Sequence, residues 1–207
     1  MWSADRSKDE EVLNHAAKAL QAMLHSGALP SSLLGTANCI LIMPRVKQFA
    51  VGLGGSSGHG PLLCRKGRNF SGGKWSPPAM YTVGGATAGL QLGGSSTDYV
   101  ALILSPSAAN KLLAGKIKIG KSDLSATVGA ASSTGWVVDT DVMAFGHGKG
   151  LSGGASLNGA TLDPDADADQ RLYEKAVSSR DIVLEDAVKP TPAGQSLMVL
   201  LEKVGRS

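Results

Sequence analysis

The segment Gly115–Ser122, which reads GKIKIGKS, matches the nucleotide-binding P-loop pattern G-x-x-x-x-G-K-S letter for letter. A P-loop holds phosphates where a strand precedes it and a helix follows it, because the helix amides and the lysine then converge on the phosphates. Here the preceding residues are helix-like, and charged and apolar side chains alternate from Lys116 to Ile119 as in a strand. The alternation therefore predicts a strand with a basic face rather than a nucleotide site.

Two further patterns of the form G-x-S-x-G place Ser56 and Ser152 where a hydrolase could carry its nucleophile. Such a serine works on a sharp turn between a strand and a helix, and neither serine is followed by a helix-forming segment. His59 and His147 could act as general bases, but glycines flank both, and we expect them in exposed turns. We therefore predict that the chain is not an enzyme.

An acidic segment spaces Asp163, Asp165 and Asp167 like the ligands of a calcium-binding EF-hand loop, with Glu174 at the twelfth position. Ala168 stands where that loop needs a glycine for its sharp turn. A loop that caps the following helix explains the same carboxylates, so calcium binding stays open. The chain has four histidines and two cysteines and shows no zinc-type cluster, and we expect no cofactor.

The remaining candidates are basic residues with two aromatic residues among them, and not one carboxylate occurs from Val12 to Thr97. Each Lys or Arg near an anionic bilayer contributes about 1 kcal/mol, and aromatic side chains lie well at the bilayer interface. We therefore predict a lipid-binding face made of Arg45, Lys47, Arg65, Lys66, Arg68, Phe70, Lys74, Trp75, Lys116, Lys118 and Lys121. The alternative for Trp75 is a place in the core, where it would anchor the corner at Pro77 and Pro78.

Charge is segregated along the chain, although the net charge is only +3. Residues 1–122 carry 13 Lys and Arg against 5 Asp and Glu, a net +8, and residues 123–207 carry 7 against 12, a net −5. A basic half of this kind favours an anionic partner, and the alternative is that the two halves mix on the folded surface. The basic side chains form no recognition helix, so we expect no nucleic-acid partner.

A long amphipathic helix is predicted over Lys8–Ser26, because Ser7 and Glu10 form a capping-box pattern and Gly27 can end the helix. Its apolar side chains recur at helical spacing, and we expect the helix to pack across a sheet. The alternative is a helix that lies on a membrane surface, which the acidic first turn makes less favourable.

Short segments with alternating apolar residues and glycine turns make up most of the remaining chain. We expect strands at residues 39–43, 49–53, 62–64, 80–83, 99–104, 117–119, 124–130, 142–144, 155–157 and 182–184, and helices at residues 107–114, 169–177 and 193–204. This pattern predicts a mainly β (α+β) fold: an antiparallel, closed or nearly closed β-barrel with the N-terminal helix packed across it. We expect one domain over residues 1–207, with a core at about residues 8–186.

The two cysteines, Cys39 and Cys64, both lie in apolar strand-like runs, and either a disulfide or two buried thiols would suit them. No apolar run approaches the roughly 18 residues that span a bilayer. The start Met1-Trp2-Ser3 looks trimmed, which suggests that a leader has been removed.

The chain is organised around Leu62–Gly94, which contains a short apolar strand, a basic loop, the corner WSPP and a glycine-rich run. Together with Pro30–Gly60, Asp98–Ser105 and Lys149–Lys175, this stretch resembles the SYLF-domain family of lipid-binding proteins over most of residues 12–186. The resemblance implies a barrel crossed by a helix and phosphoinositide-type lipids as ligands. The bare domain, without an SH3 domain, looks most like the bacterial, often exported members of that family.

Two functions follow as hypotheses. The first is a non-enzymatic lipid-binding module that attaches peripherally to anionic phospholipid membranes through the basic, aromatic-containing loop face. The second is a protein-interaction module, since eukaryotic members of the family bind actin filaments through this domain. The sequence does not define the oligomeric state.

Overall fold

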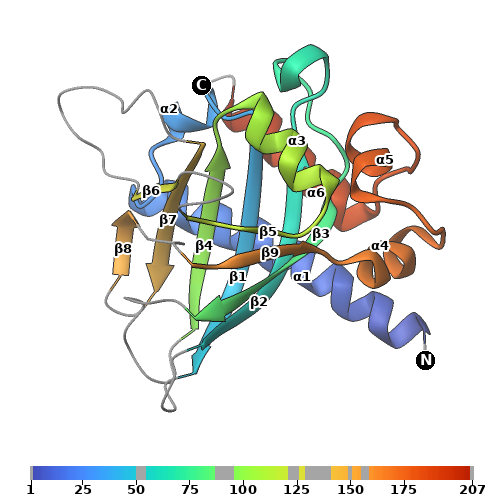
Figure 1. The fold of residues 1–207 in the computed structure, drawn as a ribbon, viewed down its shortest axis with the longest axis horizontal. Helices are drawn as coiled ribbons and strands as arrows, with labels where there is room; N and C mark the ends of the chain where they lie inside the picture. The colour runs from blue at the N-terminus through green and yellow to red at the C-terminus, as the bar shows by residue number, and fades with distance from the viewer. Residues whose placement is uncertain are drawn as a thin grey trace.

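The structure is a computed structural model that describes residues 2–49, 55–86, 96–120, 126–128, 141–148, 151–154 and 159–205. A curled sheet forms its centre, and helices cover both faces of that sheet (Figure 1). Helices α1 (Trp2–Ser26) and α6 (Pro192–Val204) lie on one face, and α3 (Pro106–Ala114) lies on the other. The fold is therefore mixed α and β.

The sheet has nine strands in the order β5-β9-β3-β2-β1-β4-β7-β6, and β8 also pairs with β7. The strands are β1 (Cys39–Phe49), β2 (Gly55–Cys64), β3 (Ala79–Ala86), β4 (Ser96–Ile103), β5 (Ile117–Lys118), β6 (Ala126–Val128), β7 (Val142–Gly148), β8 (Leu151–Gly154) and β9 (Thr161–Pro164). All pairs are antiparallel except β6 with β7.

The predicted antiparallel sheet with the N-terminal helix packed across it is confirmed, but the predicted closed or nearly closed barrel is instead a curled sheet that is not fully closed. Within the described residues, β5 at one end of the sheet does not pair with β6 or β8 at the other end. The inner face is covered instead by apolar side chains of α3 and of α5 (Ser179–Leu184), which pack into the core inside the curl. Because these helices bury the inner face, the sheet is a half-barrel that needs no closure by further strands.

The central strands β1 and β4 are apolar on both faces, which explains their uninterrupted apolar sequences. Leu41 and Tyr99 point into the curl, whereas Ile40 and Val100 point toward α1 and α6. A strand buried on both faces reads as a continuous apolar run rather than an alternating one. The predicted buried strand that begins at Cys39 is therefore confirmed, although the strand continues beyond Met43 to Phe49.

Helix α1 packs across the sheet, as its apolar spacing predicts. Its side chains Leu13, Ala16 and Leu20 are fully buried. Gly27 follows the last residue of the helix with a φ of 76°. The predicted capping box at Ser7 is wrong, because the helix begins at Trp2 and Ser7 lies within it. No helix of the described residues is both long enough and apolar enough to cross a bilayer.

Two predictions near the C-terminus differ from the structure. The segment from Ile182 to Leu184, predicted as a strand, belongs to α5, because Ser178 and Asp181 form a capping box at its start. Helix α4 (Ala166–Tyr173) begins and ends earlier than predicted. It begins at Ala166 because the side chain of Asp165 accepts a hydrogen bond from the backbone amide of Ala168. The remaining short helices are α2 (Ser31–Leu34) and the 3-10 turn η1 (Arg68–Phe70). The predicted helices before Gly115 and at the C-terminus are confirmed within a residue.

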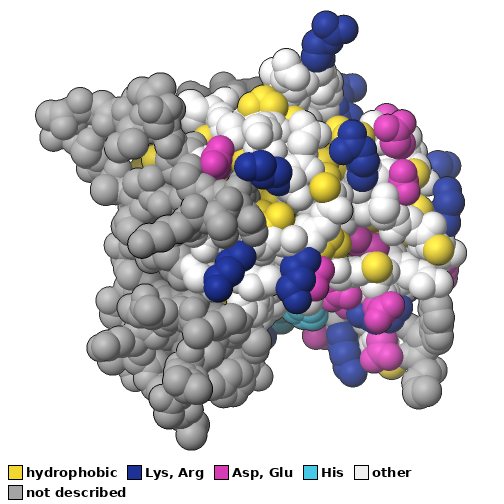
Figure 2. Space-filling view, in the orientation of Figure 1, with side chains coloured by type: hydrophobic (Ala, Val, Ile, Leu, Met, Phe, Trp, Pro, Cys, Tyr) yellow, Lys and Arg dark blue, Asp and Glu magenta, His cyan; other side chains and the backbone are white. Residues whose placement is uncertain are grey.

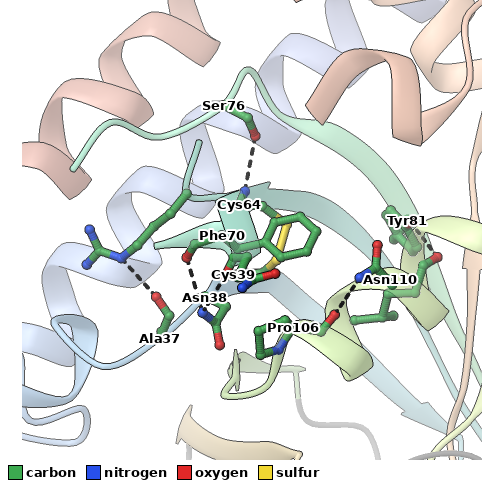
Figure 3. The surroundings of a disulfide bond; sticks show 12 residues. Ala37, Asn38, Cys39, Cys64, Phe70, Ser76, Tyr81, Pro106 and Asn110 are labelled. Carbon is green, nitrogen blue, oxygen red and sulfur yellow. Dashed lines mark hydrogen bonds between the residues drawn. A yellow bond between two sulfur atoms is a disulfide. The ribbon is translucent and has the colours of Figure 1, made fainter. Parts of the chain in front are cut away.

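The two cysteines form a disulfide, which decides between the two alternatives that the sequence left open. Cys39 and Cys64 are opposite each other in the β1–β2 pair, and their Cα atoms are 3.9 Å apart. Both are fully buried, and the ring of Phe70 lies beside the sulfur atoms (Figure 3). The disulfide therefore closes the hairpin at the end from which the basic loop emerges.

Candidate functional site

The basic loop, residues 65–75, connects β2 to the corner before β3. Its first arginine, Arg65, forms hydrogen bonds within the fold. Arg65 donates hydrogen bonds from Nε to the carbonyl oxygen of Ala37, at 2.9 Å, and from Nη2 to that of Leu34, at 2.8 Å. Its guanidinium also lies 4.6 Å from the ring centroid of Trp75. Burial lowers the pKa of Arg65. Arg65 thus fastens the loop to the segment between α2 and β1.

The two aromatic side chains of the basic loop are buried: Trp75 is 1% exposed and Phe70 is 4% exposed. A tight backbone turn directs Phe70 inward, because Gly67, Asn69 and Phe70 all have positive φ. The Asn38 side chain stabilises this turn by donating to the carbonyl oxygens of Asn69 and Phe70. For Trp75, the structure corresponds to the alternative in which it anchors the corner.

Some of the Lys and Arg side chains on the outside of the basic loop form ion pairs with carboxylates, and others are exposed. Lys66 forms an ion pair with Asp186, whereas Arg68 and Lys74 are exposed. Lys116 and Lys118 are exposed on or beside β5, and Lys116 lies 3.9 Å from Asp163. The side chain of Lys47, and Lys121 as a whole, lie outside the described residues. Lys and Arg side chains on the face shown in Figure 2 are spread out and do not form one patch.

Arg45 lies far from the basic loop along the hairpin. Its strand β1 is irregular between Leu41 and Lys47, and Arg45 has a φ of 54°, which marks a bulge in the pairing. The backbone amide of Arg45 donates to Asp98 Oδ1 at 2.8 Å. The exposed side chain points toward α1, where Nη1 lies 3.4 Å from His15 Nε2. The predicted lipid-binding residues therefore occupy at least two separate regions of the molecule.

A groove runs between α1 and the sheet at this bulge. We call it the α1 groove: it has a volume of about 460 Å³ and is lined by Val12, His15, Pro44, Arg45, Gly58, His59, Thr82 and Val83. A neighbouring hollow of about 690 Å³ shares His15 and Arg45 and adds Glu11 and Lys18. Sequence reasoning missed His15 and gave His59 no binding role. The proline and arginine that interrupt the apolar run of β1 were the available signal of a bulge.

Neither serine pattern forms a nucleophile elbow. Ser56 lies within β2 opposite Gly85, and Ser152 lies within β8 opposite His147. The register also places Asp98 opposite His147, but Nδ1 of that histidine is buried without a hydrogen-bond partner among the described residues. Within the part of the chain that the structure describes, no third group orients His147 as a general base.

The carboxylates of the acidic segment bind separate partners within the protein and do not point toward one common calcium site. Asp165 caps α4, and Glu174 reaches Arg6 at 2.9 Å. Asp169 is completely buried and accepts the backbone amide of Met80 at 2.8 Å through Oδ1. Burial raises the pKa of Asp169 to about 8, against the opposing effect of the Met80 hydrogen bond. Residues 2–49, 55–86 and the other described segments hold no cluster of three metal-ligating side chains.

Comparisons with known proteins agree with the resemblance in the sequence. The Ysc84 family, described as "Las17-binding protein actin regulator", matches residues 84–204. Protein YSC84 of Saccharomyces cerevisiae is 27% identical over 96% of this chain and 43% of its own length. An SH3 domain-containing protein of Schizosaccharomyces pombe is 26% identical over 95% of this chain and 46% of its own length. LAS seventeen-binding protein 3 of Saccharomyces cerevisiae is 25% identical over 96% of this chain and 44% of its own length.

This chain therefore spans less than half the length of these relatives. The names of the relatives describe binding and regulatory proteins rather than enzymes. The family match covers more than half of this chain and continues from β3 through the whole of α6. The chain belongs to the Ysc84 family of SYLF-domain proteins.

Proposed function

We propose that this chain is a non-enzymatic protein-interaction module that binds an acidic surface of a partner protein. The family description, which refers to Las17 binding and actin regulation, and the relative named LAS seventeen-binding protein 3 support this proposal. These relatives align with 95% or more of this chain, so they share the whole domain with it rather than a short motif.

One structural observation carries the choice of a protein surface over a membrane. The aromatic side chains that would insert into a bilayer, Phe70 and Trp75, are packed into the core, and Arg65 is held by backbone carbonyls. Adsorption to a membrane would then depend on a few exposed cations, each contributing about 1 kcal/mol. Contacts between exposed charges and a folded acidic partner need no aromatic insertion.

Co-sedimentation with actin filaments tests the proposal, because filaments offer a repeated acidic protein surface. We expect the chain to sediment with filaments at low salt and to be released at high salt, since contacts between exposed charges are screened. Neutral and anionic vesicles, tested in parallel, provide the comparison. If the chain binds anionic vesicles at low salt but never binds filaments, the protein-interaction proposal is wrong.

A second candidate function is charge-driven adsorption to anionic phospholipid membranes, including phosphoinositide-containing ones. It is favoured by the exposure of Arg68 and Lys74 on the basic loop and of Lys116 and Lys118 on the β5 side. We expect Arg68→Gln with Lys74→Gln to weaken sedimentation with phosphatidylserine vesicles, while Lys8→Gln on α1 leaves it unchanged. Equal effects of the two changes would argue against the basic loop as the membrane contact.

We also propose that the protein works in an oxidising compartment, as expected for an exported chain. The Cys39–Cys64 disulfide supports this proposal, because disulfides persist outside reducing cytosol. Both cysteines are fully buried, so the protein from fractionated cells is unfolded in denaturant without a reductant before thiol alkylation. Both cysteines should then stay unmodified, and modification of either cysteine would contradict the proposal.

A further inference from the structure

We infer that the α1 groove is a docking site for an acidic peptide segment of the partner, an inference that rests on the protein-interaction function proposed above. The groove has a volume of about 460 Å³ and lies between α1 and strands β1 to β3. That size suits one or two side chains of an extended segment rather than a folded surface.

Both walls of the groove are fixed in place. On one side, the buried side chains of Leu13 and Ala16 hold α1 against the molecule. Nearer its N-terminus, α1 is tied to α4 by the ion pair of Asp9 with Arg171, in which Nε and Oδ2 are 2.6 Å apart. A groove with fixed walls binds a ligand without first ordering its own chain, which removes one of the costs of association.

The bulge in β1 sets the direction of the Arg45 side chain, which is the central cation of the groove. Arg45 has a φ of 54°, a backbone conformation that few residues other than glycine and asparagine adopt readily. The hydrogen bond from its amide to Asp98 Oδ1, at 2.8 Å, stabilises this conformation. Bulges often redirect a side chain at a functional site. Here the redirected side chain leaves the plane of the sheet and faces α1.

Among the residues that the structure describes, Arg45 has few side-chain partners and keeps most of its hydrogen-bonding capacity for a ligand. Its side chain contacts His15 Nε2 at 3.4 Å, and none of the ion pairs formed among the described residues includes it. A guanidinium has five N–H donors and fits a carboxylate through two parallel hydrogen bonds. His59 and Lys18 line the groove and its neighbouring hollow and supply further donors, whereas His15 Nε2 accepts from Arg45 and holds the guanidinium in place.

The composition of the lining favours an acidic peptide over a membrane or a polyphosphate. Val12, Pro44 and Val83 give the groove an apolar part that suits a side chain next to the bound carboxylate. Glu11 lines the neighbouring hollow and would repel a ligand carrying many negative charges. A single Asp or Glu flanked by apolar residues satisfies both features, because it places one negative charge at Arg45 and an apolar group beside it.

The test measures fluorescence anisotropy of a short labelled peptide in which Glu and Leu alternate, with a peptide of Gln and Leu as the matched control. The central variant is Arg45→Asn, since asparagine accepts the left-handed backbone and keeps the amide that donates to Asp98. Arg68→Asn is the control variant, because it removes an exposed cation at the far end of the same hairpin.

We expect Arg45→Asn to weaken binding of the Glu peptide at least about tenfold, the loss typical of a charged hydrogen-bonded contact, and Arg68→Asn to leave it unchanged. His15→Gln gives a second measurement if Arg45→Asn lowers the melting temperature, and it should weaken binding about threefold or more. Equal binding by wild type and both groove variants overturns the inference. Inorganic phosphate or phosphatidylserine vesicles that compete as strongly as the Glu peptide also overturn it.

Actin filament sedimentation with the same variants separates this inference from the proposed function. Filament binding by a protein whose binding of the Glu peptide does not require Arg45 overturns the groove and leaves the protein-interaction function standing. Binding of the Glu peptide that requires Arg45, in a protein that binds no filaments, supports the groove while the filament result counts against the proposed function.

Discussion

The buried carboxyl group of Asp169 should make the stability of this protein fall as the pH rises. Asp169 is 0% exposed, and its Oδ2 atom has no hydrogen-bond partner among the described residues. Burial raises its pKa to about 8, and the nearby carboxylates of Asp165 and Asp9 add to the effect, whereas the Met80 amide opposes it. The folded protein therefore holds a proton that the unfolded chain releases near its ordinary pKa of 3.8.

The size of the effect follows from the two pKa values. Because the folded-state pKa is raised, the contribution to stability is complete below pH 4 and is lost as the pH rises through 8. Between pH 5 and pH 8 the free energy of unfolding should fall by about 3.5 kcal/mol from this group. Replacement by asparagine, an uncharged side chain of the same shape, should abolish this dependence and retain an acceptor for the Met80 amide.

Urea unfolding of wild type and Asp169→Asn at a series of pH values measures the effect. The difference between the two free energies of unfolding should change by about 3.5 kcal/mol in favour of the variant from pH 5 to pH 8. Asp167→Asn is the matched control, because Asp167 is exposed in the same helical turn. Parallel curves for wild type and Asp169→Asn would refute the reasoning.

Three further changes test the packing. Gly60→Ala should destabilise the protein by about 3 kcal/mol or more in urea unfolding, because a Cβ atom there would lie 1.8 Å from the Ile42 carbonyl oxygen, while Gly84→Ala, with no atom within 4 Å, should be mild. Replacing both cysteines by alanine should lower the free energy of unfolding by about 3 kcal/mol, from a crosslink between residues 25 apart, and an unchanged value would argue against the disulfide. Arg65→Ala should cost about 2 kcal/mol in thermal or urea unfolding by orphaning the carbonyls of Leu34 and Ala37, whereas equal stability of Arg65→Ala and Arg68→Ala would show that those bonds contribute nothing.

Local patterns in the sequence predicted the parts of the fold that depend on one face of one element. The apolar spacing in α1 and the uninterrupted apolar run from Cys39 identify buried surfaces directly, so both elements were found. Short apolar runs were less informative: Ile182–Leu184 suits a strand or a helix, and the cap at Ser178 decided for the helix. Whether the sheet closes into a barrel could not be predicted from local sequence patterns, because it depends on α3 and α5 packing against the inner face of the sheet.

The site depended on information that the sequence carries only weakly. A basic loop with two aromatic residues looks the same whether its rings point outward or inward, and the inward direction of Phe70 results from three positive φ angles. The α1 groove joins His15 to Arg45 and His59, residues brought together by strand register and by a bulge. Spacing along the chain therefore grouped Arg45 with the basic loop, although Arg45 lies near the middle of the hairpin and the loop emerges from one end.

The disulfide has a consequence for how β1 and β2 find their alignment. A strand that is apolar on one face resists sliding, because a slip of one residue would turn its apolar side chains toward water. Strand β1 is apolar on both faces from Cys39 to Met43, so a slipped arrangement would still bury apolar side chains. The covalent link between Cys39 and Cys64 excludes such slipped arrangements. It thereby sets which residues of β1 arrive at the bulge, and hence that Arg45, rather than a neighbour, faces α1.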